Sequence, residues 1–309
     1  MKNNFETFDI TAPDTKHLKA RKYNAENSKG AVIIVHGMQE HQKRYADFAE
    51  FLAKNNYNTY TYDQRGHGET AGSVEDLGFF TPKNGWQTVV NDLHLLVQTV
   101  KEENPEHPVY ILGHSMGSFV TRTYILDKSK FIDGVILSGT APSAGLLGQL
   151  GIFLSYLTTI FRGKKHPAKL LDNIAFGDFN KKIKPKRTKQ DWLSRDEKVV
   201  DDYINDPYCG TLFSAQFFND MLGGIETANH KNLVKSISKK LSIHLLSGEK
   251  DPVGEYGEGV KKVKLLYENA GIENLSMKLY PEGRHEMLNE LNKNEVYSDI
   301  LNWLNAHSV

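Results

Sequence analysis

A serine flanked by two glycines stands where the chain predicts a sharp turn. The motif is Gly113-His114-Ser115-Met116-Gly117; an apolar run at residues 109–112 precedes it, and residues 118–126 can continue as a helix. A Gly-x-Ser-x-Gly turn between a strand and a helix exposes the serine hydroxyl beside a helix N-terminus, which favours developing negative charge. The pattern therefore predicts that Ser115 is a nucleophile.

A serine hydroxyl needs a base to take its proton and an acid to orient that base. Residues 241–246 and 275–280 are typical of strands, and their ends are expected at the same sheet edge as the serine. Asp251 follows the first run and His285 the second, in the chain order serine, acid, histidine. We expect Ser115, Asp251 and His285 to form a catalytic triad, with Glu249 as the alternative acid.

Acyl transfer also passes through an oxyanion, which two preorganised N–H donors must stabilise. The backbone N–H of Met116, directly after the serine, is one candidate. The loop after the apolar run 31–35 supplies the other, which we assign to Met38. Both assignments rest on position along the chain, because a backbone donor does not depend on its side chain.

Strand-like and helical segments alternate through most of the sequence. Residues 31–35 are continuously apolar, residues 58–62 and 133–138 are typical of further strands, and segments with helical spacing, such as 84–103, lie between the strands. This alternation predicts an α/β fold with a mostly parallel sheet and helices on both faces. Two short strand-like runs before residue 24, divided by a turn-prone Ala-Pro-Asp, predict a hairpin at the edge of the sheet.

The alternation breaks between residues 141 and 235, which predicts an inserted helical cap. We accordingly divide the chain into a first core segment (1–140), a cap or lid insertion (141–235) and a second core segment (236–309). The cap carries a basic run at 181–189, which is typical of a solvated face and alternatively of transient contact with an anionic membrane surface.

The cap begins with a strongly apolar segment, residues 146–161. It is shorter than the roughly 20 residues that a membrane span needs, and glycine, glutamine, serine and threonine interrupt it. We expect a buried or lipid-contacting helix. Its position beside a serine site suits a fatty chain, so we expect substrate contacts from Leu146, Leu150, Phe153 and Leu154.

The composition limits the choice of partners and location. Lysine plus arginine equals aspartate plus glutamate at 38 each, so no global charge favours nucleic acid. One cysteine, Cys209, and a start without an apolar signal segment predict a cytoplasmic protein, as a monomer or a homodimer. Metal-binding spacings such as His-Glu-x-x-His are missing from the sequence, and we expect neither a metal nor a cofactor.

Together the motifs resemble the monoacylglycerol lipase and lysophospholipase group of the α/β-hydrolases. The resemblance extends from residue 31 to the last helix, is weak in the cap, and rests on these segments: His36-Gly37-Met38-Gln39-Glu40-His41 with Arg44-Tyr45, Asp63-Gln64-Arg65-Gly66-His67-Gly68, the serine turn, Gly248-Glu249-Lys250-Asp251 and Glu282-Gly283-Arg284-His285-Glu286. It implies an α/β-hydrolase fold with the same triad and oxyanion donors, a mobile cap over an acyl pocket, and a monoacyl lipid ester as the small-molecule substrate. Two residues depart from the group: Met38, where a smaller residue is usual, and Ser118, where glycine is common.

Other functions remain open on the same residues. The chain could be a short-chain carboxylesterase, a thioesterase or a serine aminopeptidase on this fold, or a ligand-binding member without catalysis. Glu40 and Arg44 have two interpretations as well: an ion pair that braces the oxyanion loop, or substrate-binding residues that contact a polar head group.

Overall fold

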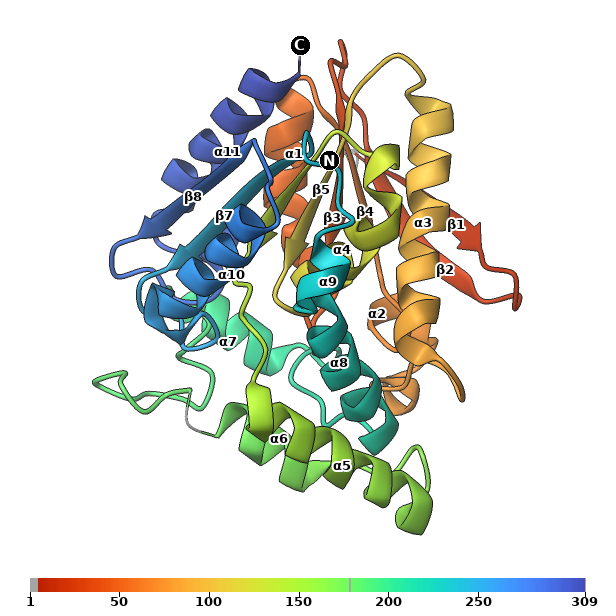
Figure 1. Ribbon diagram of the computed structural model, residues 1–309, viewed down its shortest axis with the longest axis vertical. Helices are drawn as coiled ribbons and strands as arrows, with labels where there is room; N and C mark the ends of the chain where they lie inside the picture. The colour runs from red at the N-terminus through yellow and green to blue at the C-terminus, as the bar shows by residue number, and fades with distance from the viewer. Residues whose placement is uncertain (1–4, 178, 309) are drawn as a thin grey trace.

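One eight-stranded sheet organises the chain (Figure 1). The structure is a computed structural model that describes residues 5–177 and 179–308. The strands are β1 (Glu6–Thr11), β2 (His17–Tyr23), β3 (Ala31–Val35), β4 (Asn58–Tyr62), β5 (Val109–His114), β6 (Gly134–Ser138), β7 (Ser242–Gly248) and β8 (Leu275–Tyr280). Their order is β1-β2-β4-β3-β5-β6-β7-β8; β1 and β2 form an antiparallel hairpin at one edge, and β3 to β8 are parallel. The predicted α/β class and the edge hairpin are confirmed.

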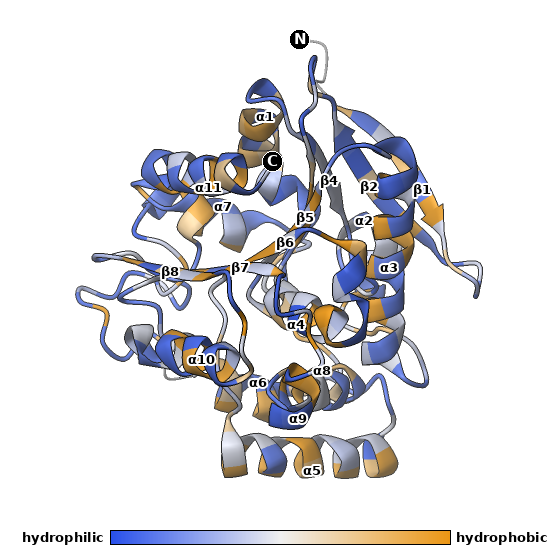
Figure 2. Cartoon of the chain, turned by 45° about the horizontal axis from the view of Figure 1, so that its top comes forward, coloured by the Kyte–Doolittle hydropathy of each residue, from blue (hydrophilic) through white to orange (hydrophobic). Residues whose placement is uncertain are grey.

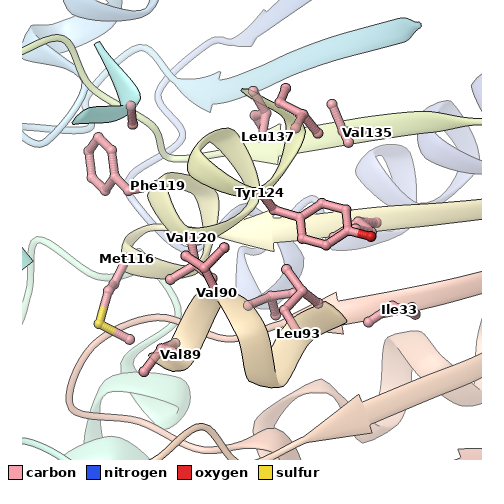
Figure 3. Packing of buried hydrophobic residues seen from close by; sticks show 14 of the residues in the cluster. Ile33, Val89, Val90, Leu93, Met116, Phe119, Val120, Tyr124, Val135 and Leu137 are labelled. Carbon is pink, nitrogen blue, oxygen red and sulfur yellow. The ribbon is translucent and has the colours of Figure 1, made fainter. Parts of the chain in front are cut away.

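Helices cover both faces of the sheet, as predicted. The core helices are α1 (Ala46–Lys54), α2 (Gly68–Ala71), α3 (Gly85–Glu103), α4 (Met116–Lys128), α10 (Glu258–Asn269) and α11 (Lys293–His307). The five residues of β3 are all buried, and alternate ones face opposite sides. Val32 and Ile34 belong to the buried cluster that includes residues of α1 and α11, whereas Ile33 belongs to the cluster on the other face, which includes residues of α3 and α4 (Figures 1 and 3). A strand covered on both faces explains the uninterrupted apolar run.

The described residues between β6 and β7, in the segment where the alternation breaks, form five helices. They are α5 (Gly145–Arg162), α6 (Lys169–Phe176), α7 (Glu197–Asn205), α8 (Ala215–Ala228) and α9 (Lys231–Val234). Helix α8 packs tightly on the core, since a Cβ atom on Gly224 would lie 2.0 Å from the ring of Trp86 in α3. Helices α5 and α6 lie farther from the sheet, at the lower end of the molecule in Figure 1.

Of the two expectations for residues 146–161, a buried or a lipid-contacting helix, the structure excludes a buried helix α5. Only Gly148 and Ser155 are buried in it, whereas Leu146 is 84% exposed and Phe161 80% exposed. Figure 2 shows apolar residues along this helix at the margin of the molecule. No helix in the described part of the chain has the length and apolar character required to cross a membrane.

Candidate active site

Ser115 occupies a strained turn between β5 and α4. Its φ of 52° and ψ of −119° are unfavourable for a residue with a side chain. Its N–H donates to Ser138 O at 2.9 Å, which fixes the turn against β6. A Cβ atom on Gly117 would lie 2.1 Å from Val35 O, so glycine is required for α4 to pack this close to β3. The predicted strand, sharp turn and helix are therefore present.

Asp251 and His285 meet at the same edge of the sheet. Asp251 follows β7 and His285 follows β8, and His285 Nδ1 lies 3.0 Å from each carboxylate oxygen of Asp251. Both side chains are buried. Asp251 also accepts hydrogen bonds from the Ser247 hydroxyl at 3.0 Å and from Val253 N–H at 2.9 Å, which fix its orientation. Glu249, the alternative acid, is exposed.

The two groups shift each other's pKa. Burial raises the pKa of Asp251, but the charge of His285 and the hydrogen bonds that Asp251 accepts outweigh burial, so the net pKa is lowered. Burial lowers the pKa of His285, but the charge and hydrogen bond of Asp251 outweigh it, so the net pKa is raised above 6.5. Because an ionised carboxylate only accepts hydrogen bonds, we assign the imidazole proton to Nδ1, which leaves Nε2 as the basic nitrogen.

Ser115 and His285 both line a small cavity of about 30 Å³. Its wall also includes Met38, Glu40 and Trp192. The ring of Trp192, from the insertion, lies 5.0 Å from the His285 ring, and Trp192 O accepts a hydrogen bond from His285 N–H at 3.3 Å. The sequence analysis did not identify Trp192, because it lies in the insertion outside every recognised motif.

The loop after β3 approaches Ser115 closely. A Cβ atom on Gly37 would lie 3.1 Å from Ser115 Cβ and 2.7 Å from Glu40 Oε1, so the loop requires glycine there. Glu40 Oε1 accepts hydrogen bonds from Gly37 N–H at 2.6 Å and from the Tyr45 hydroxyl at 2.7 Å. The Glu40 side chain thus holds the loop in place by accepting from the backbone of Gly37.

Arg44 forms ion pairs that hold Glu40 in this position. Its Nη1 donates to Glu40 at 2.7 Å, and Nη1 and Nη2 donate to Glu286 at 2.6 and 2.7 Å. Arg44 lies outside the walls of both cavities described here, whereas Glu40 is part of the smaller one. The arrangement favours the ion-pair interpretation of these two residues over contact with a substrate head group.

Met38 and Met116 both contribute, together with Ser115, to the wall of a larger cavity. Met116 is the first residue of α4, where helical N–H groups have no partner within the helix. Within residues 5–177 and 179–308, neither backbone N–H has a hydrogen-bond acceptor. Their assignment as oxyanion donors remains a prediction.

The larger cavity, with a volume of about 280 Å³, begins at Ser115 and is apolar. Helices α4, α5, α6 and α8 and the loop after Asp251 form its wall, with Phe119, Phe176 and Phe218 among the lining side chains. No charged side chain of the described chain lines it. A cavity of this kind binds a hydrocarbon group next to the serine.

Helix α5 faces this cavity with residues other than those predicted. Leu147, Gly148 and Gly151 line it, whereas Leu146, Leu150, Phe153 and Leu154 do not. Positions 147, 148 and 151 share one face of a helix, because neighbouring residues are about 100° apart around its axis. The prediction selected large apolar side chains, of which Leu146, Leu150 and Phe153 lie on the wrong face and Leu154 lies on the inward face beyond the cavity wall. Leu154 packs against the core, and the other three are exposed.

One group of side chains in the described part of the chain has the donor atoms of a metal site. The donor atoms of His41, Asp206 and Cys209 lie within 4.8 Å of one another. His41 Nε2 is already 2.9 Å from Asp206 Oδ2, and burial raises the pKa of Cys209, which keeps the thiol protonated and a poor ligand. The group joins the loop after β3 to the insertion.

The sheet order, the serine turn and the helices on both faces define an α/β-hydrolase. The profile of the Hydrolase_4 family, described as serine aminopeptidase, S33, matches residues 26–292. The chain belongs to this family and is a serine hydrolase of the lipase and esterase type.

Individual relatives confirm the resemblance to monoacylglycerol lipases. The chain is 26% identical over 303 residues to a monoacylglycerol lipase of Mycolicibacterium smegmatis, covering 97% of this chain and 92% of the relative. It is 25% identical over 310 residues to human monoglyceride lipase, covering 96% and 89%. The crystal structure of a carboxyl esterase from Bacillus coagulans in complex with glycerol superposes with a TM-score of 0.91 at 28% identity, over 99% of both chains.

Proposed function

We propose that the protein hydrolyses the carboxylic ester of monoacyl lipids, such as monoacylglycerols or lysophospholipids, through an acyl-enzyme. Ser115 attacks the ester carbonyl while His285 Nε2 takes the hydroxyl proton, and Asp251 stabilises the resulting imidazolium. Backbone N–H groups of Met38 and Met116 stabilise the oxyanion. His285 then protonates the departing alcohol, and water releases the fatty acid by the same route. The reaction requires no cofactor.

The apolar cavity at Ser115 is the observation that carries the lipid assignment. Its volume of about 280 Å³ and its uncharged wall suit one acyl chain, while the polar alcohol departs through the smaller cavity beside Glu40 and His285. The monoacylglycerol lipases among the relatives support the same substrate class. We propose the insertion 141–235 as the cap, since α5, α6 and α8 supply most of the cavity wall.

Chain-length dependence tests this assignment. We would measure kcat and KM for p-nitrophenyl esters from acetate to palmitate, beside a monoacylglycerol and a lysophosphatidylcholine, for the natural chain and for Ser115→Ala. We expect activity that rises from acetate to medium or long chains and disappears in Ser115→Ala. Activity on acetate alone would replace the lipid assignment by a short-chain esterase.

An aminopeptidase is the second candidate because of the family description. Such an enzyme binds a positively charged amino group and needs an unpaired carboxylate near the serine. Glu40 and Glu286 are the carboxylates in the smaller cavity, and both are paired with Arg44. We therefore expect no release of amino acids from aminoacyl-p-nitroanilides, and efficient release would favour the peptidase.

Helix α5 is the surface that we propose for transient contact with lipid aggregates. Leu146, Leu150 and Phe161 are all more than half exposed on it. Burying such side chains in a lipid interface contributes about 1.5–3 kcal/mol each. We expect Leu146→Ser/Phe161→Ser to weaken co-sedimentation with anionic vesicles at least tenfold and to leave hydrolysis of p-nitrophenyl acetate unchanged. Equal sedimentation of both forms would contradict this contact.

A further inference from the structure

The residue after the proposed oxyanion donor Met38 has an unusual conformation. Gln39 has a φ of 58°, in the left-handed region that glycine tolerates and residues with a Cβ atom avoid. A residue stays in such a conformation only when its surroundings hold it there. The contacts of Gln39 therefore determine how the loop after β3 presents Met38 N–H to the reaction.

The insertion supplies the contacts that hold Gln39. Its side-chain Nε2 donates to Asp172 Oδ1 at 3.1 Å and to Thr211 O at 2.8 Å. Its backbone oxygen accepts a hydrogen bond from Gly210 N–H at 3.0 Å. Asp172 belongs to α6, whereas Gly210 and Thr211 lie in the segment that joins α7 to α8. Two separate parts of the insertion thus fix one residue of the loop.

A second link lies two residues farther along the loop. His41 Nε2 is 2.9 Å from Asp206 Oδ2, and Asp206 immediately follows α7. This pair fixes the far end of the loop, so that Gln39 makes the hydrogen bonds to the insertion that lie nearest to the proposed donor. Met38 itself has no hydrogen bond from its N–H to the described residues, and its placement depends on its neighbours.

Helix α6 connects Gln39 to the acyl cavity. Leu171, Ile174 and Phe176 of this helix line the cavity, and Asp172 on the same helix accepts from Gln39. An acyl chain in the cavity packs against α6 and holds it in place. Binding energy from this remote part of the substrate can then act on the reacting carbonyl, which raises kcat instead of only lowering KM.

We infer that Gln39 is a positioning residue that links the packing of α6 on the acyl chain to the placement of Met38 N–H. The inference rests on the proposed function and adds a route by which a long acyl chain accelerates the chemical step. Oxyanion donors contribute only when they are preorganised, and loss of one donor lowers kcat by about 10²–10³-fold. Loosening a donor without removing it is expected to have a smaller effect, about tenfold.

The test compares Gln39→Ala, Asp172→Ala and the double variant on p-nitrophenyl acetate and p-nitrophenyl decanoate. We expect each single change to lower kcat for decanoate about tenfold and for acetate less than threefold, with KM within twofold of the natural value. The double variant should be no slower than Gln39→Ala, because Gln39→Ala already removes the contact that Asp172→Ala removes. Asp172→Asn keeps an acceptor oxygen and should restore kcat.

Asp201→Ala is the control, since it removes only an exposed ion pair with Arg187 inside the insertion. Thermal unfolding of every variant separates local from global effects. Equal losses on both esters, additive losses in the double variant, or a change in KM alone would overturn the inference. A natural chain that hydrolyses no ester, or an active Ser115→Ala, would instead overturn the proposed function. If the natural chain hydrolyses no ester, the rate at which alkyl fluorophosphonates label Ser115 tests Gln39 instead. Gln39→Ala should then slow labelling by a long-chain probe about tenfold and by a short-chain probe less than threefold.

Discussion

Replacing Arg44 by alanine is expected to destabilise the protein by about 3 kcal/mol at pH 8. Arg44 is buried between Glu40 and Glu286, and three N–O distances of 2.6–2.7 Å join them. Its loss leaves two buried carboxylates without a counter-ion, and removing one partner of a buried pair costs about 3–5 kcal/mol. We expect the lower end of this range because Glu40 keeps its hydrogen bonds from Gly37 and Tyr45.

The loss of stability in Arg44→Ala should be smaller at pH 5.5 than at pH 8, because the variant changes the pKa of Glu40. Burial raises its pKa, but the charge of Arg44 and its other partners lower it to about 2 in the natural chain. The stabilisation that ionised Glu40 gives the natural chain is therefore complete above its unfolded pKa near 4.5 and is lost only as the pH falls toward 2. Without Arg44, burial remains and the folded-state pKa rises above 4.5. The folded variant then binds more protons than the unfolded chain, so its stability falls as the pH rises.

Urea unfolding at pH 5.5 and pH 8 measures this difference. Arg44→Lys should recover part of the stability, because it restores the charge without the two-pronged contact to Glu286. Lys43→Ala is the control: its ion pair with Glu69 is exposed, and we expect a loss below about 1 kcal/mol. A loss for Arg44→Ala below about 1 kcal/mol at pH 8, or an equal loss at both pH values, would refute the reasoning.

Three further predictions concern the reaction. The kcat/KM for ester hydrolysis should fall at acidic pH with a midpoint above 6.5, because His285 must be neutral and its pKa is raised; a profile from pH 5 to 9 checks this, and a midpoint below 6 contradicts it. Asp251→Asn should lower kcat by about 10⁴-fold in stopped-time ester assays, as in other triads, and a loss under tenfold would exclude its role. Gly151→Val should favour short esters about tenfold over long ones in competition assays, since a Cβ atom there already lies 2.9 Å from Leu222 Cδ1; Leu150→Val, on the outer face, should change nothing.

The core and the edge that holds the reaction centre could be predicted from the sequence for a simple physical reason. Parallel strands covered on both faces appear as uninterrupted apolar runs, and their carboxyl ends meet at one edge. Ser115 and Asp251 follow fully buried strands, His285 follows the less buried edge strand β8, and the structure brings Asp251 and His285 to 3.0 Å. Their catalytic roles remain predictions that the experiments above test.

The insertion could not be predicted to the same depth, because no strand register fixes it. The large apolar residues of α5 suggested a substrate-facing surface, but the cavity is lined by Leu147 and two glycines, which let α5 approach α8. Trp192 and Gln39 carried no signal, since their importance comes from contacts between segments distant in the sequence. Both contacts join the insertion to the loops around Ser115.

Arg122 attaches both ends of the insertion to the core. This fully buried residue of α4 donates to Ala141 O at 2.7 Å and to Asn229 Oδ1 at 2.6 Å, near the entry and exit of the insertion. Because α4 begins at the serine turn, both ends are attached to the same helix that positions Ser115. The segment from α5 to α7 lies between these attached ends and reaches the reaction centre through its own contacts, Asp172 with Gln39 and Trp192 with His285. Changes on the exposed face of α5, away from these contacts, are therefore expected to leave the geometry around Ser115, Asp251 and His285 intact.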